Sequence, residues 1–305
     1  MSEKRNPLIE LYDKRYKQLT ILPIIFLVIC LGIIAFNYFS TGEIIQRDIT
    51  LKGGVTIIFT PTSEVNLEAL EGALRLKHPD LEIELRKLGG TGFIVESDTV
   101  DSARIDNIIK DVSSELGGLD TEQYSVQVVG SSLGESFYRE AVFAMLLAFV
   151  FMAIVVLAYF RNFVPSMLVI FAAFADIVMP FAMMIIFNIK LSTAGIAAFL
   201  MLIGYSVDTD ILLTSRLRKF FKTGKANADD GTILDNILGA MRTGMLMTLT
   251  AIVVVLIAYF FSDAETLKQI MLILAIGLTF DIVNTWLTNA GMLRWYLEHK
   301  AKKNE

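Results

Sequence analysis

Cysteine and histidine are nearly absent from this 305-residue sequence, and their scarcity excludes several kinds of site. Cys30 is the only cysteine, so no intramolecular disulfide can form. His78 and His299 lie far apart in polar stretches and offer no metal-ligand constellation. A basic excess is also missing, because the formal net charge is −5, and this argues against nucleic-acid binding. The sequence contains no GxxxxGK[ST] loop, so we expect no cofactor and no energy from ATP through that motif.

Apolar residues are what the chain has in excess, at 54% hydrophobic against roughly 45–50% in soluble domains. A helix that crosses a ~30 Å hydrocarbon core needs about 20 mostly apolar residues. The stretches that meet this requirement are 19–39, 141–160, 163–187, 191–214, 243–261 and 269–293. The first exceeds the apolar core of a signal peptide and lacks a small-residue cleavage site, so we expect a retained anchor.

Lysine and arginine are distributed unevenly around these spans. If the N-terminus lies in the cytoplasm, the cytoplasmic segments hold sixteen Lys/Arg, and the short outer loops hold only Lys190 and Lys268. Cytoplasmic segments of membrane proteins carry such an excess. We therefore expect a cell-membrane protein with both termini in the cytoplasm: an amphipathic segment at 1–18, a loop at 215–242 and a basic tail at 294–305.

A hydrophilic segment, 40–139, separates the first span from a five-helix bundle at 140–293. It carries nine Lys/Arg and seventeen Asp/Glu, a net charge of −8. Alternating apolar residues predict strands in VTIIFTP, EIELRKL, GFIVES and YSVQVV, and helical spacing predicts helices at 66–76 and 100–116. This βαββαβ order is typical of a ferredoxin-like domain. The expected fold is a membrane α-helical protein with six transmembrane helices and one extracytoplasmic ferredoxin-like domain between the first and second.

Four aspartates lie within the apolar spans: Asp176 in the third, Asp208 and Asp210 in the fourth, and Asp281 in the sixth. An aspartate at the centre of a membrane helix costs about 2.5 to 3.5 kcal/mol on insertion scales, so such residues generally have a partner or a function. Two positions on a helix differ by about 200°, so Asp208 and Asp210 cannot share a face.

Further polar residues surround these aspartates. Arg242 begins the fifth span at a depth where it can pair with Asp208 or Asp210, and Asn284, Thr285 and Thr288 follow Asp281 as a polar stripe. We expect a polar seam through the bundle whose carboxylates gain and lose protons. The alternative is a static role, because polar side chains between membrane helices contribute only about 0.6 to 2 kcal/mol.

Several motifs occur in an order that resembles the SecF branch of the SecD/SecF family, within the RND superfamily. The fourth span contains GYSVDTD, with Gly204, Tyr205, Ser206 and Thr209; DITLKGG, with Asp48, Gly53 and Gly54, follows the first span; VGSSLGE, with Gly134 and Glu135, precedes the second; and MRTG, with Arg242, opens the fifth. Bacterial members carry their acidic residue at the position of Thr209, so the resemblance assigns a proton site to this helix and not to one side chain. The GYSVDTD form looks archaeal.

The resemblance implies an accessory role in protein export, with a SecD-like subunit, the Sec translocation channel, a translocating polypeptide and the lipid bilayer as partners. It also implies coupling to the proton gradient, and movement of the outer domain about Gly53 and Gly54. Glycines at that place equally fit a tight entry into a strand. Two alternatives stay open: one half of an RND-type transporter for a small molecule or lipid, and a structural subunit without energy coupling. The signatures of an intramembrane aspartyl protease are missing, so we expect no enzyme.

Overall fold

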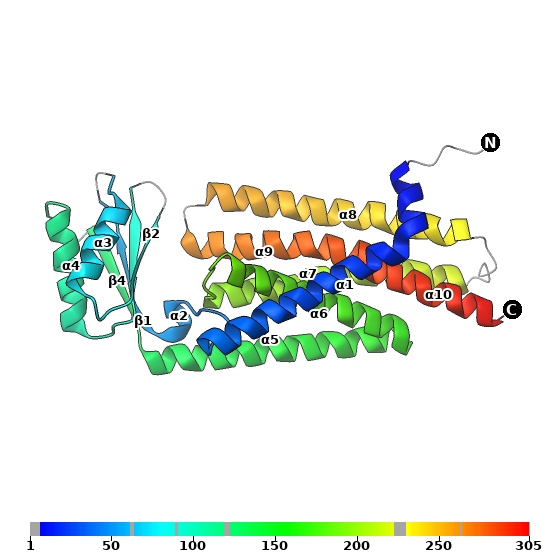
Figure 1. The fold of residues 1–305 in the computed structure, drawn as a ribbon, viewed down its shortest axis with the longest axis horizontal. Helices are drawn as coiled ribbons and strands as arrows, with labels where there is room; N and C mark the ends of the chain where they lie inside the picture. The colour runs from blue at the N-terminus through cyan, green and yellow to red at the C-terminus, as the bar shows by residue number, and fades with distance from the viewer. Residues whose placement is uncertain are drawn as a thin grey trace.

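The computed structural model describes residues 7–61, 64–88, 91–118, 123–222, 230–262 and 264–304. A small α/β domain lies at one end of an elongated helix bundle, and both chain termini lie at the other end (Figure 1). The two ends of the molecule are therefore on opposite sides of any membrane that the bundle crosses.

Six helices in the described part of the chain are long and apolar enough to cross a membrane, which confirms the six predicted spans. They are α1 (Pro7–Thr41), α5 (Ser131–Phe160), α6 (Phe163–Ile186), α7 (Thr193–Lys222), α8 (Asp230–Phe261) and a last helix formed by α9 (Glu265–Val283), η2 (Asn284–Asn289) and α10 (Ala290–Asn304). Their outward faces carry many exposed apolar side chains, as a surface in contact with lipid requires.

Two predicted boundaries are wrong. The segment 215–242 was expected to be a loop, but α7 continues to Lys222 and α8 begins at Asp230, so its described residues are helical, and 223–229 lie outside the described residues. At the other end of the bundle, α5 begins at Ser131, where the outer segment was expected to reach residue 139. Polar helix ends that project beyond the hydrocarbon carry no hydropathy signal, so hydropathy alone cannot mark where these helices end.

The outer domain has the predicted βαββαβ order. Its elements are β1 (Gly54–Phe59), α3 (Leu67–Lys77), β2 (Ile83–Lys87), β3 (Phe93–Ser97), α4 (Ser102–Glu115) and β4 (Tyr124–Val129). The strands form one antiparallel sheet in the order β2-β3-β1-β4, as in a ferredoxin-like fold. Alternate residues such as Ile57, Leu85 and Val95 pack beneath α3 and α4. The opposite face of the sheet is turned toward the bundle (Figure 1).

A one-turn helix, α2 (Ile49–Lys52), connects the first span to the outer domain. Asp48 caps it by accepting a 2.7 Å hydrogen bond from the backbone N–H of Ile49. The residues just before α2 pair with the loop between α6 and α7, where Leu191 N–H donates to Gln46 O at 2.8 Å and Asp48 N–H donates to Leu191 O at 2.8 Å. The linker is thus bound to the bundle by backbone hydrogen bonds.

Candidate functional site

Only one of the two aspartates in the GYSVDTD motif lies on the buried face of α7. Ser206, Thr209 and Asp210 follow the i, i+3, i+4 spacing of one helical face, and all three are buried. Asp210 is 0% exposed, whereas Asp208 is exposed on the other side of the helix. The expectation that the two cannot share a face is confirmed, and only Asp210 belongs to the interior of the bundle.

Asp176 meets this face from α6. It is 1% exposed and accepts a short hydrogen bond from Ser206 Oγ and a 2.5 Å hydrogen bond from Asn284 Nδ2. Three different helices therefore supply this carboxylate and its two donors. The carboxylate is held by neutral groups alone.

Asp210 and Asp281 share a donor. Thr285 Oγ1 lies 3.0 Å from Asp210 Oδ1 and 3.3 Å from Asp281 Oδ1, and Thr209 Oγ1 lies 3.4 Å from Asp281 Oδ2. Asn289 Nδ2 adds a 2.7 Å hydrogen bond to Asp210 Oδ1. The carboxylates of Asp176, Asp210 and Asp281, with these hydroxyl and amide donors, form what we call the acidic cluster.

A π-helical turn, η2, shapes the sixth span at the acidic cluster. Residues five apart on an α-helix point about 140° away from each other, but i→i+5 bonding brings them close to one face. Asn284 and Asn289 are five apart, and both donate to the acidic cluster. Ala290 N–H accordingly donates to Thr285 O, five residues back. The predicted stripe of Asn284, Thr285 and Thr288 is buried, and its first two residues donate to the acidic cluster, whereas Thr288 Oγ1 has no described hydrogen-bond partner. Asn289, four residues after Thr285, belongs to the same stripe and was not predicted.

No cation contacts the acidic cluster in the described part of the chain, and Arg242 lies elsewhere. Its side chain is exposed and makes no ion pair with any described residue, so the expected pairing with Asp208 or Asp210 is wrong. The reason is helical geometry: Gly244 is the residue of α8 that packs against Thr209, and a position two residues away points about 200° from it.

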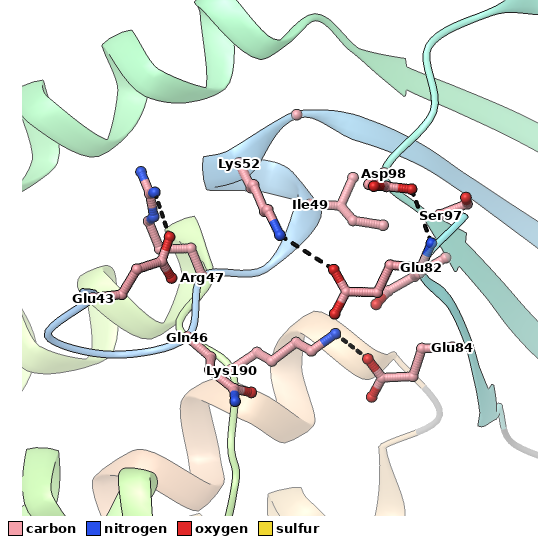
Figure 2. A pocket seen from close by; sticks show the side chains of 12 residues that line it. Glu43, Gln46, Arg47, Ile49, Lys52, Glu82, Glu84, Ser97, Asp98 and Lys190 are labelled. Carbon is pink, nitrogen blue, oxygen red and sulfur yellow. Dashed lines mark hydrogen bonds and ion pairs between the residues drawn. The ribbon is translucent and has the colours of Figure 1, made fainter. Parts of the chain in front are cut away.

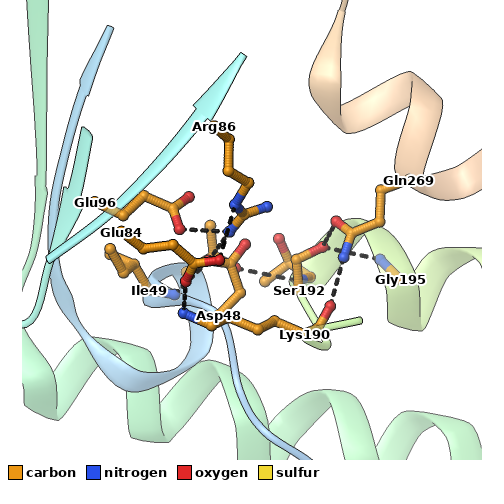
Figure 3. A network of polar contacts seen from close by, with 11 residues as sticks. Asp48, Ile49, Glu84, Arg86, Glu96, Lys190, Ser192, Gly195 and Gln269 are labelled. Carbon is orange, nitrogen blue, oxygen red and sulfur yellow. Dashed lines mark hydrogen bonds and ion pairs between the residues drawn. The ribbon is translucent and has the colours of Figure 1, made fainter. Parts of the chain in front are cut away.

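A second polar site joins the outer domain to the bundle (Figure 3). Arg86 on β2 forms ion pairs with Asp48 at 3.5 Å, Glu84 at 3.7 Å and Glu96 at closer range. Burial raises the pKa of Glu96 to about 7; the negative charge of Asp48 adds to this, and Arg86 opposes it. We call Arg86, its three carboxylates and Lys190 the junction network.

Lys190 extends the junction network to the loop between α6 and α7. Its ammonium group pairs with Glu84, and its backbone carbonyl accepts a 2.7 Å hydrogen bond from Gln269 Nε2 on α9. Gln269 also accepts from Ser192 Oγ. Beside these contacts lies a pocket of about 140 Å³, which Figure 2 shows lined by charged side chains, among them the Lys52–Glu82 pair. The outer domain thus contacts the ends of the helices that carry the acidic cluster.

The glycines of the linker lie at a close backbone crossing. Gly53 has φ 88° and Gly54 has φ 144°, values that favour glycine. A Cβ on Gly53 would overlap the backbone of Ser131, and a Cβ on Gly134 would lie 2.7 Å from the backbone nitrogen of Gly53. These glycines were predicted to form either a hinge or a tight entry into a strand. The close packing of the linker against the start of α5 fits the tight entry better.

The remaining motif residues do not join either site. Gly204, Tyr205 and Glu135 are exposed, and no heavy atom lies within 4 Å of a Cβ built on Gly204. Arg86, Glu84 and Lys190 were not predicted. The available signal for the first two is that they alternate along β2 with the core residues of that strand, which places them on the sheet's other face.

The fold and the two sites define a class: a multi-pass membrane protein with one outer α/β domain and a buried acidic cluster. Comparisons with known proteins agree. The chain matches the family "Protein export membrane protein SecD/SecF, C-terminal" over residues 108–299, more than half of its length. It is 36% identical to "Protein-export membrane protein SecF" of Methanolacinia petrolearia, covering 95% of this chain and 98% of that protein, and 36% identical to the SecF of Pyrococcus furiosus, covering 99% and 97%.

The crystal structure of SecDF, "a translocon-associated membrane protein", from Thermus thermophilus has the same fold, with a TM-score of 0.77 at 19% identity. The match covers 96% of this chain but 38% of that one, so the chain spans little more than a third of the solved SecDF protein. The chain belongs to the SecD/SecF family of protein-export membrane proteins.

Proposed function

We propose that the acidic cluster binds and releases protons, and that this exchange drives the accessory role in Sec protein export that family membership gives this chain. The named relatives are export subunits, which is not an enzyme role. In this proposal a SecD-like subunit and the Sec channel are the partners, the transported cargo is a polypeptide, and the energy comes from the proton-motive force. A proton that crosses the membrane supplies about 2.3 kcal/mol per 100 mV.

The observation that carries the proposal is the charge balance of the acidic cluster. Asp176, Asp210 and Asp281 are each 1% exposed or less, and their hydrogen-bond donors are neutral hydroxyls and amides. Three like charges cannot be buried together in a low-dielectric interior without a cation or bound protons. No cationic side chain among the described residues is in contact, and in our proposal bound protons provide the neutralisation.

Changes at the acidic cluster have a direct structural route to the outer domain. Asp176 and Asp210 lie on α6 and α7, and the loop that joins these helices carries Lys190. Lys190 pairs with Glu84 on β2, and Gln269 connects the same loop to α9, which carries Asp281. A change in packing among the three helices would therefore reach the outer domain through the junction network.

The orientation follows from charge. Both termini lie at the end of the bundle opposite to the outer domain (Figure 1). The Lys/Arg excess also lies at the terminal end, so this end is cytoplasmic and the outer domain extracytoplasmic.

The outward faces of α7 and α8 fit a membrane partner. Asp208 and Tyr205 are exposed on α7, and Arg242 is exposed on α8. Charged groups left on a lipid-facing surface are costly, so we assign this surface to the SecD-like subunit.

The test is a pair of matched substitutions, Asp210→Asn and Asp208→Asn, measured as export rate in cells and as proton flux in vesicles that contain the chain and its SecD-like partner. We expect Asp210→Asn to lower both by about tenfold or more at unchanged protein level, because it removes a titratable group from the cluster. Asp208→Asn should retain proton flux when assembly is intact. Normal export and flux in Asp210→Asn would reject proton coupling through this residue and favour a structural subunit.

A further inference from the structure

The π turn that brings Asn289 to Asp210 needs support from outside its own helix. Because Ala290 N–H donates to Thr285 O, the carbonyl of Trp286 loses the donor that an α-helix would provide four residues later. That carbonyl accepts a 3.0 Å hydrogen bond from Tyr12 Oη. Thr20 Oγ1 lies 2.9 Å from the neighbouring carbonyl of Leu287 and 2.8 Å from the carbonyl of Tyr16 in its own helix, so its proton is shared between the two. Both hydroxyls come from α1.

Helix α1 is shaped to deliver both groups. Arg15 has non-helical dihedral angles, φ −117° and ψ 16°, and the first turns of α1 bend across the end of the bundle (Figure 1). Tyr12 lies before this bend and Thr20 after it. On the opposite side, Gly291 allows the approach, because a Cβ there would overlap the Thr20 hydroxyl.

The bent segment is also anchored to α10 by a buried arginine. Arg294 is 4% exposed and pairs with Asp13 at 2.7 Å and with Glu298 at 2.8 Å, and its guanidinium carbon lies 4.2 Å from the ring centroid of Tyr16. Tyr16 Oη donates to Glu298 at 2.5 Å. This anchor holds α1 against the last helix without touching the carbonyls of the π turn.

We propose that Tyr12 and Thr20 are positioning residues, which hold η2 in the π register that aims Asn284 and Asn289 at the acidic cluster. Without the Tyr12 hydroxyl, the carbonyl of Trp286 would be left unpaired, and a return to α-helical bonding would satisfy it through Ala290 N–H. That return would separate Asn284 and Asn289 to about 140° around the helix axis, so the two amides could not both keep their bonds to Asp176 and Asp210. The expected effect on export rests on the proposed proton role of the acidic cluster. The expected effect on the π turn does not.

The test compares two double variants of the full chain, purified with its SecD-like partner in lipid nanodiscs. The target variant is Tyr12→Phe with Thr20→Val, which removes both hydroxyls from η2. The control is Tyr16→Phe with Thr41→Val, which removes a tyrosine hydroxyl and a threonine hydroxyl from the same helix. Thr41 donates to Asn37 O at 2.8 Å, far along α1 from the π turn. The first measurement is amide hydrogen exchange in peptides that cover residues 284–291.

We expect exchange in 284–291 to be about tenfold faster or more in the target variant, and within twofold of wild type in the control. The second measurement is export rate against external pH, whose profile should be displaced in the target variant and unchanged in the control. Equal exchange in the two variants would overturn the inference. Faster exchange in the target alone supports it even if Asp210→Asn exports normally, a result that would reject the proposed function and not the positioning role. The single variant Tyr12→Phe, which keeps the ring in place, gives the same comparison if the double variant assembles poorly.

Discussion

The two polar sites of this protein treat buried carboxylates in opposite ways. In the junction network, Asp48, Glu84 and Glu96 surround the guanidinium of Arg86, and Lys190 adds a second cation. In the acidic cluster, three carboxylates are surrounded by hydroxyls and amides, with no cation among the described residues. The first site neutralises its charges with basic side chains, whereas the second has none in contact among the described residues, and our proposal assigns its neutralisation to protons.

This difference separates a structural contact from a site that can exchange protons. In a buried ion-pair network the basic side chain compensates its carboxylates, and loss of one partner leaves the others uncompensated. A cluster without cations changes charge only when its number of bound protons changes. The junction network therefore suits a fixed connection between the outer domain and the bundle, whereas the acidic cluster suits a switch.

Removing the central cation of the junction network should have the largest effect on stability. In Arg86→Met the carboxylates of Asp48 and Glu96, both buried, lose their counter-charge, a change that typically costs about 3–5 kcal/mol. We expect a matching fall in the unfolding temperature of the full chain at pH 8, measured by circular dichroism. The fall should be smaller at pH 5, where protonation replaces the lost cation.

Arg104→Met is the control for this prediction. Arg104 on α4 pairs with Asp80 at 2.7 Å, but the two side chains are 48% and 60% exposed. Exposed pairs contribute about 0–1 kcal/mol, so this variant should be close to wild type. Equal losses in the two variants would show that Arg86 acts through packing and not through charge.

Protonation of Glu96 makes the stability of the folded protein depend on pH, and we expect this effect to be of intermediate size. Its pKa is about 7 in the folded protein against an ordinary value of 4.5, so between these values the folded state binds more protons than the unfolded chain. Stability contributed by Glu96 is therefore fully present below pH 4.5 and is lost as the pH rises to about 7, by up to about 3 kcal/mol. Glu96→Gln should flatten the curve of unfolding temperature against pH over that range. An unchanged slope would assign the pH dependence to other groups.

The sequence supports prediction of the spans and of the outer domain because each has a strong periodic signal. Apolar runs mark the membrane helices, and alternation marks strands such as β1 and β2. The sequence also allows Asp210 to be predicted as the buried aspartate in preference to Asp208, because Ser206, Thr209 and Asp210 share a helical face. The π turn could not be predicted, because it has no signal in α-helical spacing, whereas Asn289 follows Thr285 by four residues and could have been included in the predicted stripe.

Contacts between distant segments account for the rest of what sequence reasoning did not find. Arg86 and Lys190 are 104 positions apart and meet through Glu84 only because the sheet's open face rests on the loop between α6 and α7. The expected pair of Arg242 with an aspartate had the right depth in the membrane but the wrong helical face. Depth can be estimated from hydropathy, whereas the orientation of a helix about its axis depends on its neighbours.

The smallest effect on stability is expected where a carboxyl group is replaced in the acidic cluster. Asp281→Asn keeps the shape of the side chain and replaces a carboxylate that no described cation contacts, so no counter-charge is left behind. We expect the unfolding temperature to correspond to a change within about 1 kcal/mol, in contrast to Arg86→Met. Proton flux in vesicles should nevertheless fall, because one titratable group is gone. A loss of stability as large as that of Arg86→Met would mean that Asp281 is charged and paired in the folded protein, and the contrast between the two sites would then not hold.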